Sequence, residues 1–194
     1  MITYETQSKT FFLSGKNYSY CMYINRAGLL QHLYWGKKIG AADATFLVAV
    51  HGLPASPNPD DYNKEITTDG MPSECGSFGR GDFRPATVVV RRKDGAAMSR
   101  FRYLSHKIVK GALHLQGMPC VRKADETLII TLKDDFSDIE LDLNYFISED
   151  SDILVRNTVV RNAGKEAAKL AKAFSFCTEL PDDRGTWSAL RLVG

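Results

Sequence analysis

The sequence predicts an all-β fold, an antiparallel β-sandwich. Apolar and polar residues alternate along several segments, most clearly over 139–145, where every odd position is apolar and every even position is polar. Turn-forming segments separate these runs, and strands spaced by about 8 to 12 residues with such turns are typical of sandwiches and barrels. A chain of 194 residues can bury a genuine core, as one domain or a large part of one.

The expected strands follow the chain in a simple order. Alternation, or short runs of β-branched and aliphatic residues, predicts strands at 18–24, 88–90, 127–133, 139–145 and 153–155. Glycine, which tolerates a positive φ angle, predicts turns at 26–28, 93–95 and 162–164. Residues 41–85 contain few alternating runs and several Pro, Gly and Asp, so we expect a long surface connection there. Connections of this length are usually functional or mobile.

Composition excludes several classes of protein. The net charge is +2 and the basic residues are scattered, which argues against nucleic-acid binding. The first residues lack the pattern of a signal peptide, and no apolar run reaches the length of a membrane span. The cysteines lie far apart, at Cys21, Cys75, Cys120 and Cys177. We therefore expect reduced structural thiols in a cytoplasmic protein.

No cofactor or metal site is expected. The histidines, at positions 32, 51, 106 and 114, do not show metal-binding spacing, so structural or surface roles are favoured for them. Asp82-Phe83-Arg84 follows a glycine-rich stretch and admits two interpretations. An Asp82–Arg84 ion pair could pin a loop to the sheet, or the triplet could form a polar hook for a ligand or a partner subunit.

Nine short segments carry a family resemblance that covers nearly the whole chain. They are Phe12-Leu13, Ser19-Tyr20, residues 32–37, Ser56-Pro57-Asn58-Pro59, residues 81–86, 103–108 and 115–119, Thr127-Leu128, and Leu192-Val193-Gly194. In their order and spacing they resemble the amino-terminal β-sandwich, or supersandwich, of family 36 glycoside hydrolases, the group that contains bacterial α-galactosidases. The resemblance implies that residues 1–194 are an incomplete N-terminal domain that lacks the catalytic barrel.

The resemblance also implies a function and a set of site residues. Family members release α-galactosyl groups from melibiose or raffinose by a retaining mechanism, with two Asp on the barrel. Many are tetramers in which the N-terminal domain of one subunit reaches the active site of another. Candidates for the substrate rim are Gly52, Lys64 and Trp187, at positions where relatives can carry an acidic residue, Arg and Tyr. Candidates for loop or subunit contacts are Asn58, Asp82, Phe83 and Arg84.

No catalytic residue is assigned within this chain. A glycosidase needs two carboxylates that flank the scissile bond. The adjacent acidic pairs, at 60–61, 134–135 and 182–183, are interpreted as solvated turns. The alternative function is a stand-alone carbohydrate-binding or interaction module. For Trp35 and Trp187, packing within the domain is favoured over stacking on a sugar ring.

The carboxyl-terminal part carries two further expectations. Residues 165–172 have apolar positions at helical spacing, yet the family resemblance favours a strand, with Phe174, Phe176 and Leu180 as its best apolar positions. The family sandwich continues past the Leu-x-Gly motif, so we expect Gly194 to be a cut within the domain. Unpaired edges of a truncated sandwich would favour self-association.

Overall fold

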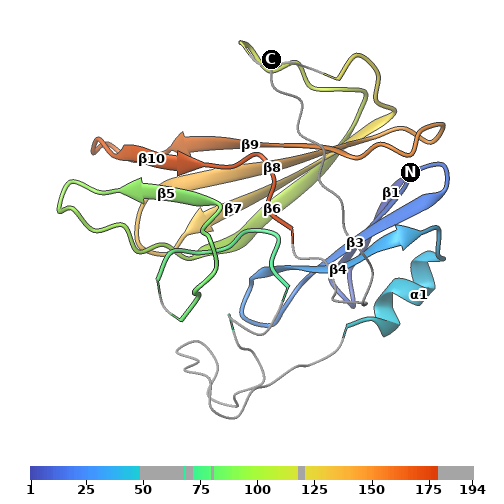
Figure 1. Cartoon of the computed structure of the whole chain (residues 1–194), viewed down its shortest axis with the longest axis horizontal. Coiled ribbons are helices and arrows are strands. Elements are labelled where there is room, and N and C mark those ends of the chain that lie inside the picture. Colours follow the sequence, from blue (N-terminus) through green and yellow to red (C-terminus); the bar gives the residue numbers. More distant parts are fainter. Residues whose placement is uncertain (49–67, 69–71, 80, 118–120, 179–194) are drawn as a thin grey trace.

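A computed structural model describes residues 1–48, 68, 72–79, 81–117 and 121–178. These residues form ten strands and one short helix (Figure 1). The elements are β1 (Ile2–Glu5), β2 (Thr10–Ser14), β3 (Tyr18–Ile24), β4 (Leu30–Lys37), α1 (Ala41–Phe46), β5 (Val88–Arg91), β6 (Phe101–Lys110), β7 (Glu126–Asp134), β8 (Ile139–Ile147), β9 (Val155–Asn162) and β10 (Lys169–Ala173). No helix among the described residues is long and apolar enough to cross a membrane.

The predicted antiparallel β class is confirmed. Two four-stranded antiparallel sheets, β1-β2-β3-β4 and β6-β7-β8-β9, follow the chain order, and β5 pairs with β10 in a separate two-stranded sheet. The turns predicted at 26–28 and 93–95 are present: the first joins the paired strands β3 and β4, the second follows β5, and Gly28 and Gly95 both have positive φ. The two larger sheets lie on either side of the core (Figure 1).

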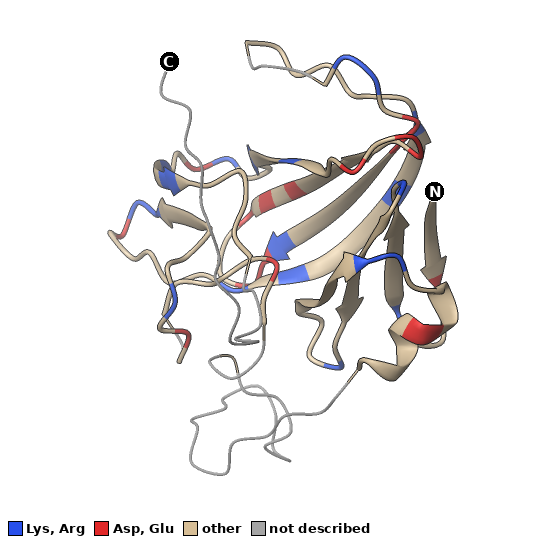
Figure 2. Cartoon of the chain, turned by 45° about the vertical axis from the view of Figure 1, so that its right-hand side comes forward, with Lys and Arg blue, Asp and Glu red and all other residues tan. Residues whose placement is uncertain are grey.

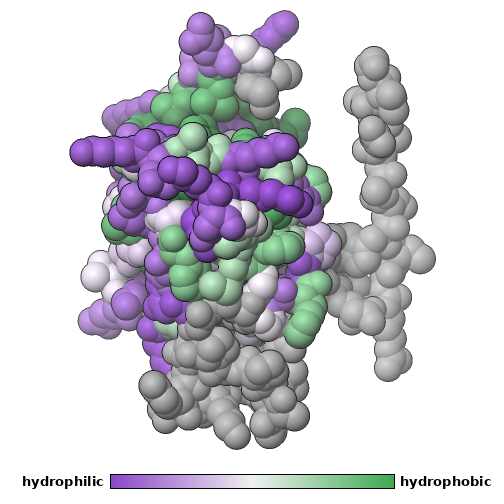
Figure 3. Space-filling view, turned by 90° about the vertical axis from the view of Figure 1, so that its left-hand side faces the viewer, coloured by the Kyte–Doolittle hydropathy of each residue, from purple (hydrophilic) through white to green (hydrophobic). Residues whose placement is uncertain are grey.

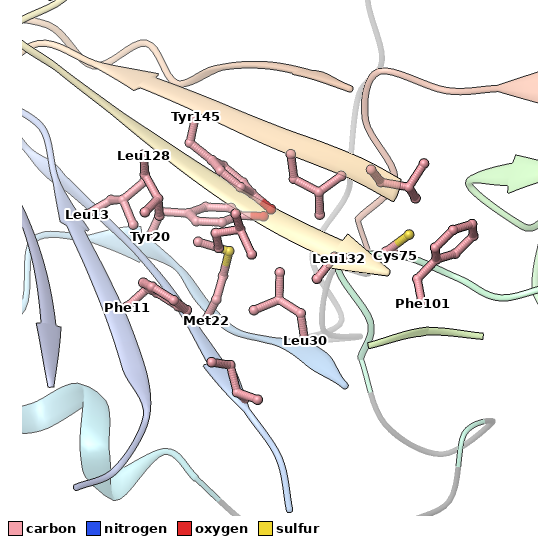
Figure 4. Packing of buried hydrophobic residues seen from close by; sticks show 14 of the residues in the cluster. Phe11, Leu13, Tyr20, Met22, Leu30, Cys75, Phe101, Leu128, Leu132 and Tyr145 are labelled. Carbon is pink, nitrogen blue, oxygen red and sulfur yellow. The ribbon is translucent and has the colours of Figure 1, made fainter. Parts of the chain in front are cut away.

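Alternation in β7 and β8 determines which residues enter the core. Leu128, Ile130 and Leu132 of β7 stand opposite Tyr145, Leu143 and Leu141 of β8, and all six are fully buried. Their neighbours along each strand point to the opposite face. Phe11, Leu13, Tyr20 and Met22 reach the same core from β2 and β3, and Figure 4 shows these side chains converging between the sheets.

The long connection expected over 41–85 begins with a short helix. The backbone N–H of Gly40 donates to the Asp43 carboxylate at 3.0 Å, which satisfies one donor at the start of α1. Ala44 of α1 is fully buried in a small cluster with Phe12 and Cys21. The helix therefore covers part of the face of the β1–β4 sheet that is turned away from the main core.

Two expectations near the carboxyl-terminal strands need correction. The strand predicted over 153–155 begins at Val155 and continues to Asn162. A strand, not a helix, does form within 165–173, as predicted from the family resemblance. Because β10 ends at Ala173, the prediction that Phe174 and Phe176 belong to this strand was wrong. The backbone N–H of Phe174 still donates to the Thr87 carbonyl at 2.9 Å, and beyond it the Cys177 carbonyl accepts a hydrogen bond from Arg156 of β9 at 3.1 Å. Leu180 lies outside the described residues.

The buried face of β8 makes a testable prediction. Leu143→Ala removes a fully buried side chain from the centre of the core and should lower the free energy of unfolding by about 2–5 kcal/mol. Leu104→Ala is the matched control, because Leu104 is 51% exposed. Urea denaturation should show a change below about 0.5 kcal/mol for the control. Equal losses in the two variants would contradict this assignment of the core.

Candidate functional site

A buried carboxylate organises the centre of the described structure. Glu74 is fully buried and lies in the irregular segment 72–79. Its Oε1 accepts hydrogen bonds from the Tyr20 hydroxyl at 2.5 Å and binds His32 Nδ1 at 2.8 Å. Its Oε2 accepts the Tyr145 hydroxyl at 2.8 Å and lies 3.2 Å from Arg156 Nη1. We call these five residues the Glu74 cluster.

The surroundings of Glu74 keep its carboxylate ionised. Burial alone would raise the pKa of this carboxyl, but the hydrogen bond with His32 and the charge of Arg156 outweigh burial and lower the pKa below its ordinary value. Burial and the nearby carboxylate raise the pKa values of Tyr20 and Tyr145 well above 10. Both hydroxyls therefore remain protonated donors, and Figure 4 shows the two rings side by side.

Arg156 extends the cluster to the carboxyl-terminal segment. Its Nη2 donates to the Glu74 carbonyl at 2.7 Å and its Nη1 donates to the Cys177 carbonyl at 3.1 Å. The guanidinium stacks over the rings of Tyr145 and Phe176, with distances of 5.0 and 5.3 Å to their centroids. One side chain thus joins segment 72–79 and strands β8 and β9 to the residues that follow β10.

The cluster does not have the geometry of a hydrolytic site. Glu74 is surrounded by donors on both oxygens and is closed to solvent, so no substrate oxygen or water can reach it. Glycoside hydrolysis needs two accessible carboxylates on opposite sides of one bond. The cluster is therefore a structural centre that holds the sheets and segment 72–79 in register.

The interpretation of the acidic pair Asp134-Asp135 as a solvated turn was wrong for Asp134, the buried last residue of β7, whereas Asp135 lies exposed in the turn that follows. Asp134 is 4% exposed, and it accepts hydrogen bonds from the backbone N–H of Arg100 at 2.8 Å and from the Ser137 hydroxyl at 2.5 Å. Asp135 pairs with both Arg100 and Arg102. These contacts fix the β7–β8 turn to the start of β6. The pairs at 60–61 and 182–183 lie outside the described residues.

The ion pair that one interpretation of Asp82-Phe83-Arg84 expects is present. Asp82 Oδ2 accepts the backbone N–H of Ser77 at 3.0 Å, and Oδ1 accepts the Arg84 Nε–H at 2.9 Å. Gly79 and Gly81, both with positive φ, form the turn that allows this closure. The ion pair pins the loop, whereas Phe83 is 84% exposed. A contact of this triplet with a ligand or a partner subunit stays a prediction.

The remaining site candidates, Gly52, Asn58, Lys64 and Trp187, lie outside the described residues. Among the residues that are described, no group of three His, Cys, Asp or Glu side chains could hold a metal ion. In Figure 2, basic and acidic residues are interspersed over strands and loops. Sequence reasoning identified Asp82 and Arg84 as a pair but missed Glu74. Arg156 could have pointed to Glu74. It stands opposite the core-facing Tyr145 in the β8–β9 register, and a charged residue in that position needs a buried partner.

Comparisons with known proteins agree on one family. The model of the Glycosyl hydrolase family 36 N-terminal domain matches residues 28–194. Alpha-galactosidase Mel36A of Lactobacillus acidophilus is 34% identical over 187 residues, which cover 94% of this chain and 26% of the relative. The chain thus spans about a quarter of the length of the curated relatives it matches.

Solved structures show the same relationship. The crystal structure of the GH36 alpha-galactosidase AgaB from Geobacillus stearothermophilus matches with a TM-score of 0.82 and 33% identity, covering 90% of this chain and 24% of that one. A variant of AgaA from the same organism, in complex with raffinose, matches with a TM-score of 0.79 and 31% identity, over 86% of this chain and 24% of that one.

The Glu74 cluster predicts a strong, pH-dependent contribution to stability. Glu74→Gln leaves Arg156 buried without its ionised partner and should lower the free energy of unfolding by about 3–5 kcal/mol at neutral pH. Because the pKa of Glu74 is lowered on folding, its contribution is present above pH 4.5, the ordinary pKa, and is lost as the pH falls through the lower value of the folded state.

Urea denaturation between pH 7 and pH 3 measures the difference in the free energy of unfolding between the wild type and Glu74→Gln. The difference should narrow as the pH falls below about 4.5, where Glu74 of the unfolded chain takes up a proton. Glu149→Gln is the matched control, since the Glu149 side chain is 67% exposed. A difference that stays constant down to pH 3 would show that folding does not lower the pKa of Glu74.

Proposed function

Because the chain belongs to the glycosyl hydrolase family 36 N-terminal domains, we propose that it is the non-catalytic part of an enzyme that hydrolyses terminal α-galactosides. One observation carries the proposal: the match to AgaB covers 90% of this chain but only 24% of AgaB. Among the described residues, the best-connected carboxylate is buried and satisfied, which fits a supporting role rather than a catalytic one.

The proposed role is to support the catalytic part and contribute to the rim of its substrate site. The Glu74 cluster fixes segment 72–79 to both larger sheets. We propose Gly52, Lys64 and Trp187 as the residues that contribute to the rim. Raffinose bound to a variant of AgaA shows the substrate class of a relative.

Activity of the full-length enzyme tests this proposal. The complete gene product should hydrolyse melibiose and raffinose, whereas the chain of residues 1–194 should not. Deletion of residues 1–194 from that product should remove soluble, active enzyme, because the catalytic part would lose the support proposed for this domain. Unchanged kcat, KM and solubility after the deletion would show that the domain does not support catalysis.

Lys64 provides a sharper test of the rim role. In the full-length enzyme, Lys64→Ala should raise KM for raffinose about tenfold or more, the effect of losing one hydrogen bond from a charged group, with little change in melting temperature. Lys93→Ala, which removes an exposed lysine from the turn after β5, is the matched control. If the kinetics of Lys64→Ala equal those of the control, the rim role of this lysine is wrong.

We also propose that the protein assembles with copies of itself. β6 is an outermost strand of its sheet, and its Leu104 and Ile108 side chains are 51% and 39% exposed. Exposed strand edges with apolar side chains favour pairing between chains. On the face at the β5–β10 end, Figure 3 shows apolar residues in separate small areas among polar ones. We therefore choose β6 rather than that face as the contact between copies of the chain.

Sedimentation velocity should reveal this self-association. The wild-type chain should sediment as a dimer or larger species at high concentration, and Ile108→Lys should shift it toward monomer by placing a charge on the edge. Ile153→Lys is the matched control, since Ile153 is 66% exposed and lies outside β6. A wild-type chain that remains monomeric at all concentrations would rule out association through this domain.

A further inference from the structure

Two of the described cysteines lie on neighbouring segments that the same side chains tie together. Arg156 Nη2 donates to the Glu74 carbonyl at 2.7 Å, and Arg156 Nη1 donates to the Cys177 carbonyl at 3.1 Å. One guanidinium therefore holds the peptide group that joins Glu74 to Cys75 next to the carbonyl group of Cys177. The two cysteines are far apart in the sequence, so their spacing gave no sign of this arrangement.

Thr87 makes a second bridge between the same two segments. It is fully buried and comes directly before β5. Its backbone N–H donates to the Gly76 carbonyl at 3.0 Å, and its Oγ1 accepts the Gly76 N–H at 3.1 Å. The Thr87 carbonyl accepts the backbone N–H of Phe174 at 2.9 Å. The chain is thus fastened to the residues after β10 on both sides of Cys75.

The two thiols differ in their exposure to solvent, and both are free in the structure. Cys75 is 7% exposed and belongs to the main core, whereas Cys177 is partly exposed. Burial raises the pKa of the Cys75 thiol to about 12, against the charge of Arg156, and Cys177 contributes to the rise. Groups of like charge act on one another's pKa chiefly at short range, which agrees with the contacts through Arg156. An oxidant in solution reaches the exposed thiol, Cys177, first.

We propose that Cys75 and Cys177 form a reversible disulfide, with a small disulfide such as oxidised glutathione as the oxidant. The Cys177 thiolate attacks one sulfur of oxidised glutathione, so that a mixed disulfide forms and one glutathione leaves. The Cys75 thiolate then attacks the Cys177 sulfur, which closes the protein disulfide and releases the second glutathione. The two protein thiols are oxidised, and their two protons and two electrons are found in the two molecules of reduced glutathione.

The segment after β10 is placed to supply the approach that the bond requires. A disulfide needs Cα atoms about 4.4 to 6.8 Å apart. Cys177 lies beyond the last residue of β10, so no strand pairing has to break when it approaches Cys75, which the core holds. The bond would join segment 72–79 to the end of the described chain where Arg156 already connects them. It depends only on contacts within this chain and not on the proposed function.

Peptide mapping of the native chain tests the proposal. The chain is incubated with oxidised glutathione, the remaining thiols are capped with iodoacetamide, and a tryptic digest is analysed by mass spectrometry without reduction. Trypsin places Cys75 in the peptide 65–80 and Cys177 in the peptide 173–184, so a cross-link between these peptides identifies the bond. The number of titratable thiols should fall from four to two, and dithiothreitol should restore it. The urea midpoint should rise on oxidation, because the cross-link constrains the unfolded chain.

Matched variants locate the bond. Cys177→Ser removes the partly exposed thiol and should abolish both the cross-link and the rise in the urea midpoint. This variant should fold normally, because it leaves the core and the Cys177 carbonyl in place. Cys120→Ser is the control, since Cys120 lies outside the described residues and has no part in the proposed bond. It should keep both the cross-link and the rise in the urea midpoint.

Three outcomes would overturn the proposal. The first is an oxidised native chain from which Cys75 is recovered as a free thiol. The second is a cross-link that joins Cys21 or Cys120 to another cysteine as often as it joins Cys75 to Cys177. The third is a cross-link between Cys75 and Cys177 that forms only in urea or lowers the urea midpoint, which would show that the native fold does not bring the two thiols together.

Discussion

The described structure depends on one buried ionic contact, between Glu74 and Arg156. Taking either charge out of water costs several kcal/mol, and the cost is offset only when the partner and further hydrogen bonds are in place. Here Tyr20, His32 and Tyr145 complete the coordination of the carboxylate. If one member of the cluster moved away, a charge would stay buried without its partner, and this cost fixes the positions of all five residues.

This contact joins parts of the fold that apolar packing alone would leave free to slide. Tyr20 comes from the sheet β1–β4, Tyr145 and Arg156 come from the sheet β6–β9, and Glu74 comes from a segment without strand structure. Apolar side chains stabilise the sandwich but are tolerant of small shifts. Directional hydrogen bonds to one carboxylate set the relative position of both sheets and of the segment between them.

Local patterns in the sequence predicted the features that neighbouring residues determine, namely strands and short-range ion pairs. Alternation placed β8, in which buried and partly exposed residues alternate over 139–143, and it also located β3 and β7, although β3 is buried on both faces. The proximity of Asp82 and Arg84 in the chain suggested their ion pair. The same reasoning failed where the decisive contact is distant. Asp134 is buried and bound by Arg100 and Ser137, and the residues beyond β10 are bound by Arg156 through the Cys177 carbonyl. No spacing in the sequence reports such contacts.

The Glu74 cluster could not be predicted for the same reason: its contacts join residues that lie far apart in the chain. Glu74 stands among polar residues in a segment without alternation, so its burial could not be inferred from its neighbours in the chain. Arg156 was the better clue, since a charged residue on a core-facing strand position requires a buried partner. The Glu74 cluster and the Asp82–Arg84 pair both turn inward, and each holds an irregular segment of the chain in place. Buried charge at these two places thus positions the segments that the alternation of apolar residues does not.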